Sequence, residues 1–200
     1  MMNKIKILAL GDSYTIGEDV PQSESWPYLL KGNLENRGLS VELKIVAKTG
    51  WTTDELGLAI EQSDLKREYD LVFLLIGVNN QYRGYCIDKY RNEFRRLLLK
   101  AKSFSVNNSV FILSIPDWSC TPFALEKDKS KISEEIDAFN KENFEISESE
   151  GAHYLSITGI SRRSADDPRY TASDGLHPSG FQYEKWVEKI ILKISWPAQI

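Results

Sequence analysis

The chain is poor in the residue types that most often bind metals or form disulfides. Its 200 residues include only two cysteines, Cys86 and Cys120, and two histidines, His153 and His177. The cysteines have neither the CxxC spacing nor the neighbouring ligands of a metal or dithiol redox site, so we expect two free thiols and no bound metal. Any chemistry that needs an imidazole base must use one of the two histidines.

The sequence also lacks long hydrophobic runs and an excess of positive charge. Its longest apolar stretches, such as the six residues Leu71–Ile76, are far shorter than the roughly 20 residues of a membrane-crossing helix. The N-terminus has no apolar stretch followed by a signal-peptide cleavage site, so we expect a cytoplasmic protein without stable membrane insertion. With 25 basic and 29 acidic side chains the net charge is -4, which argues against a nucleic-acid partner.

The overall composition is that of an ordinary soluble domain, with 42% hydrophobic and 27% charged residues. The length suits one domain with a sizeable core, and no linker, repeat or low-complexity tract divides residues 1–200. We therefore expect a single domain, and the sequence makes no prediction of its oligomeric state.

Five strand-like apolar runs alternate with amphipathic, helix-like segments. The runs are Lys4–Leu10, Val41–Ala47, Leu71–Ile76, Val110–Ile115 and His153–Ile157. The helix-like segments are Trp26–Arg37, Thr53–Gln62, Tyr90–Lys102, Ile132–Ser149 and Phe181–Ile194. Such alternation predicts an α/β fold, a three-layer α/β/α sandwich in which crossover helices cover both faces of a five-stranded parallel sheet.

Local signals add detail to this fold. Glu42 and Lys44 interrupt the second run, so we expect that strand at or near an edge of the sheet. Two capping-box patterns, Thr52-x-x-Glu55 and Ser179-x-x-Gln182, predict where two helices begin. The segment Pro116–Ser130 is expected to be a long irregular loop, and such loops are often functional.

Polar clusters follow four of the strand-like runs. They are Gly11–Thr15, Lys48–Trp51, Gly77–Asn80 and, after an intervening segment, Thr171–His177. The carboxyl ends of parallel strands meet at one edge of a sheet, and ligands of open α/β sheets bind there. We therefore expect these four clusters to converge on one site.

Ser13, Asp174 and His177 are the candidate catalytic residues of that site. Serine is a weak nucleophile unless an adjacent base, oriented by a third group, removes its proton. Pro178 biases His177 away from the helical region, toward a turn that can set Asp174 against the imidazole. The simpler alternatives are that Ser13 only caps a helix and that Asp-Gly only forms a turn. His153 is the competing base, but no acid–serine pattern lies near it, which favours a structural role.

Attack on an ester carbonyl creates an oxyanion that needs preorganised hydrogen-bond donors. Three donors are available at the predicted edge: the backbone N–H groups of Ser13 and Gly50, and the side-chain amide of Asn79. Taken singly, Gly50 can equally be a turn glycine and Asn79 a residue that closes a loop.

Taken together, these motifs resemble the SGNH hydrolases, also called the GDSL esterase/lipase family. The motifs are Gly-Asp-Ser at 11–13, Gly50, Gly-x-Asn at 77–79 and Asp-x-x-His at 174–177, and the resemblance runs from residue 5 to the last helix. It implies the flavodoxin-like SGNH hydrolase fold and no cofactor. It further implies a catalytic triad of Ser13, His177 and Asp174, and an oxyanion hole of Ser13, Gly50 and Asn79.

The sequence departs from the family pattern at two positions. Asn80 stands where many members have Asp, and Tyr14 stands in place of the Leu in the family's name. Neither departure removes a catalytic group, so the implied hydrolytic chemistry is retained.

The resemblance implies a serine esterase that hydrolyses a small acyl ester through an acyl-enzyme, with a carbohydrate O-acetyl ester as one candidate substrate. The alternatives are a lysophospholipase or thioesterase acting on lipid acyl groups, an acyltransferase, and a non-catalytic binding domain on the same fold. Arg83 can equally be a ligand for an anionic substrate group or an ion-paired surface residue. The candidate pocket residues lie near the motif loops or in the long loop: Tyr14, Trp51, Tyr82, Arg83, Trp118 and Phe123.

Overall fold

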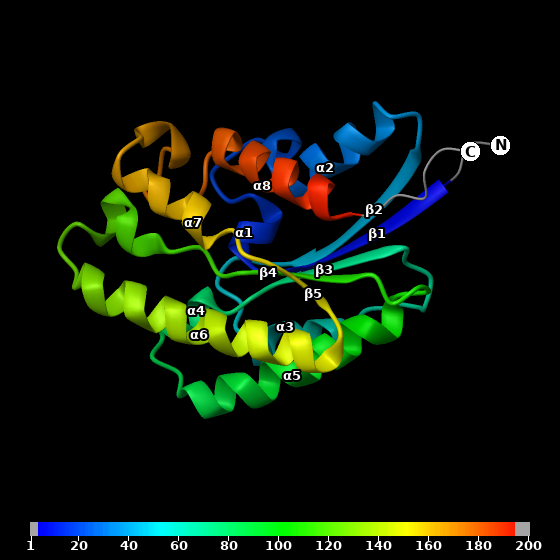
Figure 1. Ribbon diagram of the computed structural model, residues 1–200, viewed down its shortest axis with the longest axis horizontal. Helices are drawn as coiled ribbons and strands as arrows, with labels where there is room; N and C mark the ends of the chain where they lie inside the picture. Colours follow the sequence, from blue (N-terminus) through cyan, green and yellow to red (C-terminus); the bar gives the residue numbers. More distant parts are fainter. Residues whose placement is uncertain (1–3, 195–200) are drawn as a thin grey trace.

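The computed structural model describes residues 4–194, so residues 1–3 and 195–200 of the expected domain lie outside the described part. Its centre is a five-stranded parallel sheet with the strand order β2-β1-β3-β4-β5. Helices cover both faces of this sheet (Figure 1), which confirms the predicted three-layer sandwich. The strands are β1 (Lys4–Gly11), β2 (Ser40–Ala47), β3 (Leu71–Leu75), β4 (Val110–Leu113) and β5 (His153–Leu155).

The strands differ in burial according to their place in the sheet. Every residue of β3 is buried, as expected for a strand covered by helices on both faces. β1 pairs with β2 on one side and β3 on the other, so that Ile7 lies opposite both Leu43 and Leu71. β2 forms an edge of the sheet, as predicted, and its Glu42 and Lys44 are exposed.

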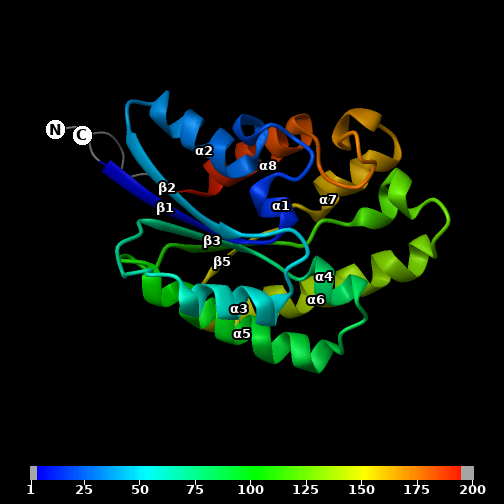
Figure 2. The same cartoon turned by 180° about the vertical axis from the view of Figure 1, so that it is seen from behind.

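Two helical layers enclose the sheet, and the view from behind in Figure 2 shows the same division. One layer holds α2 (Trp26–Glu35) and α8 (Gly180–Lys193), with the short α1 (Ser13–Ile16) and α7 (Thr158–Ser161). The other holds α3 (Thr53–Gln62), α5 (Ile87–Phe104) and α6 (Lys129–Glu150), with the short α4 (Val78–Tyr82). Within residues 4–194, none of these helices combines the length and the apolar composition needed to cross a bilayer.

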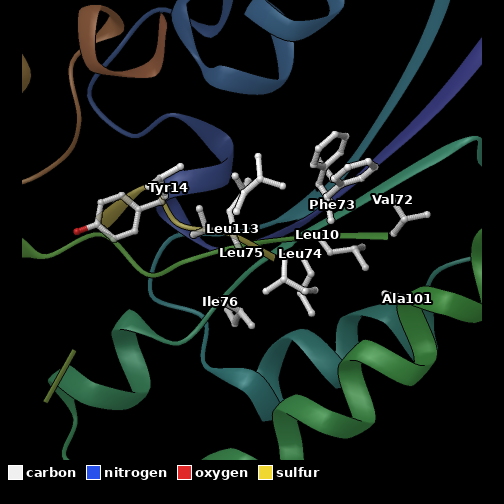
Figure 3. Close-up of a cluster of buried hydrophobic side chains, with 14 of the residues drawn as sticks. Leu10, Tyr14, Val72, Phe73, Leu74, Leu75, Ile76, Ala101 and Leu113 are labelled. Atoms are coloured by element: carbon white, nitrogen blue, oxygen red, sulfur yellow. The ribbon is translucent and has the colours of Figure 1, made fainter. Parts of the chain in front are cut away.

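Aromatic and aliphatic side chains fill the space between the sheet and the helices. Phe73 of β3 stacks on Phe111 of β4, with ring centroids 5.2 Å apart, and meets Trp26 of α2 edge to face at 5.3 Å. Figure 3 shows Phe73 among neighbours from β1 and β3 such as Leu10 and Leu74. The rigid core brings the carboxyl ends of the strands to one rim of the molecule.

The two capping-box predictions have different outcomes. At the start of α3 both halves of the box are formed, and a Glu55 carboxylate oxygen accepts from the Thr52 backbone N–H at 2.9 Å. At the start of α8 the Ser179 hydroxyl accepts from the Gln182 N–H at 3.2 Å, but the Gln182 side chain accepts from the Ser164 hydroxyl instead of reaching back. The second box is therefore only half formed.

The expectation of a long irregular loop over Pro116–Ser130 is wrong. The segment contains two 3-10 turns, η2 (Trp118–Cys120) and η3 (Pro122–Ala124), and α6 already begins at Lys129. Asp117 is fully buried and caps η2 by accepting from the Ser119 N–H at 2.9 Å. These local hydrogen bonds hold the segment in place beside the rim.

Candidate active site

A sharp turn at the end of β1 presents Ser13. Asp12 is the N-cap of α1, and its carboxylate accepts from the Tyr14 N–H at 3.0 Å. Gly11 is required for the turn, because a Cβ there would lie 2.1 Å from the Thr15 hydroxyl oxygen and 2.4 Å from the Leu75 carbonyl oxygen. The turn therefore aims Ser13 out of the strand at the rim of the sheet.

The segment after η5 (Pro168–Tyr170) brings His177 and Asp174 to this serine. His177 Nε2 lies 3.0 Å from Ser13 Oγ, and His177 Nδ1 lies 2.5 Å from a carboxylate oxygen of Asp174. The other Asp174 oxygen accepts from the N–H groups of Leu176 and His177, both at 2.9 Å. The three predicted catalytic side chains thus form one continuous chain of polar contacts across 164 residues of sequence.

The surroundings of Asp174 favour its charged form. Partial burial raises the pKa of this carboxyl, but the hydrogen bonds from the His177 ring and from the two backbone N–H groups outweigh burial and hold the pKa below its usual range. A carboxylate at Nδ1 favours the tautomer with its proton there, which leaves the Nε2 lone pair facing Ser13. The Tyr14 ring, 5.5 Å from the His177 ring and edge to face with it, supports the imidazole from the side.

Asp12, which precedes Ser13 in the chain, lies in surroundings that favour its protonated form instead. Complete burial raises its pKa to about 7, and the hydrogen bond from the Tyr14 N–H offsets this rise only in part. Its second carboxylate oxygen has no hydrogen-bond partner among the described residues. The contact with Tyr14 supports the turn that carries Ser13.

The expected oxyanion donors lie at the ends of β2 and β3. Gly50 has a φ of +83° in a turn closed by the hydrogen bond from the Trp51 N–H to the Lys48 carbonyl at 3.2 Å. The Asn79 side-chain amide donates to the Trp51 carbonyl at 2.9 Å. Since a primary amide has two N–H bonds, this contact fixes the amide and leaves a second N–H for another acceptor.

Asn80, the departure from the family pattern, has a structural role. Its amide oxygen accepts from the Thr53 N–H at 3.1 Å, and its amide nitrogen donates to the Thr53 hydroxyl at 2.7 Å. Both residues are buried. Asn80 therefore attaches the first turn of α3 to α4, beside the residue that supplies a candidate oxyanion donor.

A cavity of about 200 Å³ opens beside Ser13. Its polar lining comes from the four motif loops and includes Ser13, Gly50, Asn79 and His177. An aromatic wall faces them, in which the Trp118 ring lies 5.6 Å from that of Tyr82 and 5.9 Å from that of Phe123. The Trp118 indole N–H donates to the Gln81 side chain at 2.8 Å, which fixes the wall.

The structure brings together four of the six predicted pocket residues. Tyr14, Tyr82, Trp118 and Phe123 line the cavity, whereas Trp51 and Arg83 do not. The Arg83 guanidinium instead donates to the Gly50 carbonyl at 2.7 Å and pairs with Glu55 at 3.2 Å. Of the two interpretations of Arg83, the structure therefore favours the ion-paired one.

Three cavity residues do not belong to the predicted set: Thr49, Val78 and Leu176. All three lie within the polar clusters that were expected to converge on one site, but nothing in the sequence singled them out within those clusters.

The competing histidine lies elsewhere. His153 is exposed at the start of β5, at the opposite end of the strand from the rim, and its ring stacks on Phe111 with centroids 4.8 Å apart. In the described part of the chain, no group of three or more His, Cys, Asp or Glu side chains is placed to hold a metal ion.

Comparison with known proteins shows to which family the chain belongs. The profile of the GDSL-like lipase/acylhydrolase family matches residues 9–185, which contain every motif described above. The chain belongs to the GDSL-like lipase/acylhydrolase family. The resemblance drawn from the sequence is thereby confirmed, and it places the protein in a family of ester-hydrolysing enzymes.

One curated relative is similar in part of its sequence, and two solved structures are similar in fold. An arylesterase from Vibrio mimicus is 30% identical over 112 residues, and that match spans only 56% of this chain and 56% of the relative. A lipolytic protein of the G-D-S-L family from Veillonella parvula has a similar fold, with a TM-score of 0.78, 16% identity, and coverage of 95% of this chain and 98% of that one. An acetylxylan esterase from Geobacillus stearothermophilus follows with a TM-score of 0.77, 17% identity, and coverage of 98% and 96%.

Proposed function

We propose that this member of the family is a serine esterase that hydrolyses small acyl esters, with Ser13 as nucleophile, His177 as base and Asp174 as orienting acid. The observation that carries the proposal is the unbroken contact from Asp174 through His177 to Ser13, which ends at the cavity. A base within hydrogen-bond reach of a nucleophile, itself oriented by a third group, is the arrangement that activates a hydroxyl.

The geometry supports a two-step acyl transfer. His177 takes the proton as Ser13 Oγ bonds to the ester carbonyl carbon, and the ionised Asp174 stabilises the imidazolium that forms. The backbone N–H groups of Ser13 and Gly50 and the free N–H of the Asn79 amide would hold the oxyanion. His177 then protonates the leaving alcohol. In the second step His177 deprotonates a water that attacks the acyl carbon, and it returns this proton to Ser13 Oγ as the acid is released. Each step balances without a metal or organic cofactor.

The cavity supports a short acyl group. Its volume of about 200 Å³ is below the roughly 300–1,000 Å³ of pockets for drug-sized ligands. Tyr82 and Phe123 at its wall are 54% and 42% exposed, so the site is open on that side to a bulky leaving alcohol. A carbohydrate O-acetyl ester fits this combination, and the relatives named above include an arylesterase and an acetylxylan esterase.

Turnover of p-nitrophenyl esters of increasing acyl length tests the proposal, together with covalent labelling by a fluorophosphonate probe. We expect the acetyl ester to be preferred over octanoyl and longer esters, and labelling to disappear in Ser13→Ala while the circular dichroism spectrum is unchanged. Absence of both turnover and labelling in the wild-type protein would favour the non-catalytic binding domain.

The same assay distinguishes this esterase from two further classes of enzyme. A preference for long acyl chains would favour a lysophospholipase or thioesterase. Product that forms only when an acceptor alcohol is added would favour an acyltransferase.

A further inference from the structure

Glu18 and Asp19, which follow the C-cap Gly17 of α1, connect the turn that carries Ser13 to the two loops beside it. A carboxylate oxygen of Asp19 accepts from the Ser173 hydroxyl at 2.6 Å and from the Asp174 N–H at 2.8 Å. The Glu18 carboxylate accepts from the hydroxyl of Thr49, a cavity residue beside Gly50. Glu18 and Asp19 therefore contact one loop on either side of the cavity.

The same two-residue segment is tied to the nucleophile itself. The N–H groups of Gly17 and Glu18 both donate to the Ser13 carbonyl at 3.1 Å. Asp19, next in the chain, has a φ of +61°, a left-handed conformation that is strained for most residues with a side chain and that Asp tolerates better than most. The backbone adopts this conformation where the carboxylate reaches a segment more than 150 residues away.

We propose that Asp19 and Glu18 are positioning residues for the reaction, Asp19 by fixing the backbone that carries Asp174 and Glu18 by fixing the Thr49–Gly50 turn. The proposal rests on the function proposed above. Asp19 touches none of the reacting atoms. It holds the N–H of Asp174, whose carboxylate in turn orients the His177 ring.

The two residues act on different parts of the reaction. Loss of the Asp19 contact loosens the backbone that holds Asp174 against His177, so the imidazolium is stabilised less as it forms. Loss of the Glu18 contact releases one side of the oxyanion site and leaves the triad in place. A displacement of about 1 Å at such a site can lower the rate on the order of 100-fold.

Three substitutions isolate the carboxylate of Asp19 from its backbone. Asp19→Gly removes the acceptor and accepts a positive φ without strain. Asp19→Asn keeps an acceptor oxygen for Asp174 and also tolerates a positive φ. Asn108→Gly is the matched control, because Asn108 is the other non-glycine residue with a positive φ in residues 4–194, at 62°, and it precedes β4 at the end away from the site.

We expect Asp19→Gly to lower kcat roughly 10- to 100-fold with little change in KM, Asp19→Asn to remain within about threefold of wild type, and Asn108→Gly to match wild type. In Asp19→Gly the acidic limb of the pH profile of kcat/KM should move to lower pH, because the Asp174 carboxylate is held less firmly against the imidazolium. A loss of folded protein would scale the whole profile without moving that limb.

Glu18→Ala provides the contrasting case. We expect it to lower kcat while leaving the acidic limb in place, because the triad is intact. Ser173→Ala, which removes one donor to Asp19, should move the limb in the same direction as Asp19→Gly but less, and it serves if Asp19→Gly does not fold.

The outcomes separate this proposal from the function on which it rests. Wild-type protein without turnover or probe labelling would overturn the proposed function. Active wild-type protein whose Asp19→Gly and Ser173→Ala variants keep the wild-type kcat and pH profile would overturn the positioning role and leave the esterase assignment standing.

Discussion

The surroundings of the two histidines predict a large loss of activity on substitution of one and almost no change on substitution of the other. His177 is buried between Ser13 and Asp174, whereas His153 is exposed on an edge strand. We expect His177→Asn to lower kcat/KM of p-nitrophenyl acetate by at least about 1,000-fold, because the nucleophile loses its base. His153→Asn is the matched control and should stay within about twofold of wild type. Equal losses in the two variants would contradict the assignment of the base.

The charge state of the triad predicts the pH dependence of activity. The pKa of Asp174 is held below its usual range by its hydrogen bonds, so Asp174 is already ionised near neutral pH. The proposed base His177 can accept the proton of Ser13 only in its unprotonated form, so activity should fall on the acidic side of neutrality. Steady-state kcat/KM measured from pH 5 to 9 checks this, and a flat profile would rule out histidine as the base.

Asp12 predicts a pH dependence of stability. Burial raises its pKa to about 7 in the folded chain, so between about pH 4 and pH 7 the folded protein keeps a proton that the unfolded chain releases. Asp12 therefore lowers the free energy of unfolding as pH rises through that range, and its cost is complete above about pH 7.

Asp12→Asn, which retains an acceptor for the Tyr14 N–H, should equal wild type in stability near pH 4. At pH 8 its free energy of unfolding should exceed that of wild type by at most on the order of 4 kcal/mol. Urea unfolding of both proteins at several pH values measures this difference, and a difference that stays constant with pH would contradict a raised pKa at Asp12.

The role of a residue can be predicted from the sequence when it depends on neighbouring residues in the chain, and not when it depends on distant ones. Ser13, Asp174 and His177 are recognisable because their residue types and motifs carry the chemistry in the sequence itself. The sequence does not decide the role of Arg83, because its partners Gly50 and Glu55 come close only after β2 and α3 are in place. Trp51 failed as a pocket residue for a related reason, since adjacency to Gly50 does not determine on which side of the turn its ring lies.

At the scale of elements, α4 depends on a glycine that admits no substitution. Gly77 precedes the helix with a φ of +131°, and a Cβ there would lie 2.5 Å from the Tyr90 hydroxyl oxygen and 2.7 Å from Ile115 Cδ1. We expect Gly77→Ala to lower the free energy of unfolding by about 2–4 kcal/mol through crowding and strain. It should also lower kcat, because Asn79 is carried by this helix.

Gly84→Ala is the matched control for that substitution. Gly84 also has a positive φ, of 69°, but a Cβ there would meet no atom within 4 Å. The expected loss is therefore only the backbone cost of roughly 1–2 kcal/mol, with kcat retained. Chemical denaturation measures the free energy of unfolding of both variants. Equal losses of stability would mean that the neighbours of Gly77 move aside without cost and would contradict the crowding.

Long elements were predictable and short ones were not. The helices α2, α3, α5, α6 and α8 are indicated by apolar periodicity, which can be detected only over several turns, and the strands by their apolar runs. α4 and α7 have five and four residues, too few for a period. The 3-10 turn η2 in Pro116–Ser130 depends on the side-chain cap of Asp117 rather than on any pattern of burial.

At the scale of the whole molecule, one buried amide joins both helical layers to the sheet. Asn140 of α6 accepts from the Ile115 N–H at 2.7 Å and donates to the Ile115 carbonyl at 2.9 Å, just beyond β4. It also donates to the Thr158 hydroxyl, at 3.0 Å, at the start of α7 in the opposite layer. No apolar side chain can replace this set of contacts.

We expect Asn140→Ala to lower the free energy of unfolding by about 2–4 kcal/mol, because buried donors and acceptors lose their partners. Asn92→Ala is the matched control, since the Asn92 amide is exposed and makes one contact with the Asp88 carbonyl. It should change stability by less than about 0.5 kcal/mol. Urea unfolding monitored by tryptophan fluorescence compares the two, and similar midpoints would show that the layers are held by packing alone.

The arrangement of the layers followed from connectivity, because strands joined by helices must be parallel and must leave helices on both faces. The strand order was predictable only in part. The charged residues of β2 predicted its place at an edge, but the apolar runs of β3, β4 and β5 do not indicate which strands pair with one another.

The separation of Ser13 from His177 by 164 positions also affects when activity can appear during synthesis on the ribosome. Ser13, the proposed nucleophile, leaves the exit tunnel long before His177, its proposed base, since chains grow at roughly 5–20 residues per second. With His177 as the base, Ser13 of a nascent chain is inert until His177 has emerged and can fold back onto it. Esterase activity would appear only in chains that extend past this histidine, and its onset in a translation extract would time that folding step.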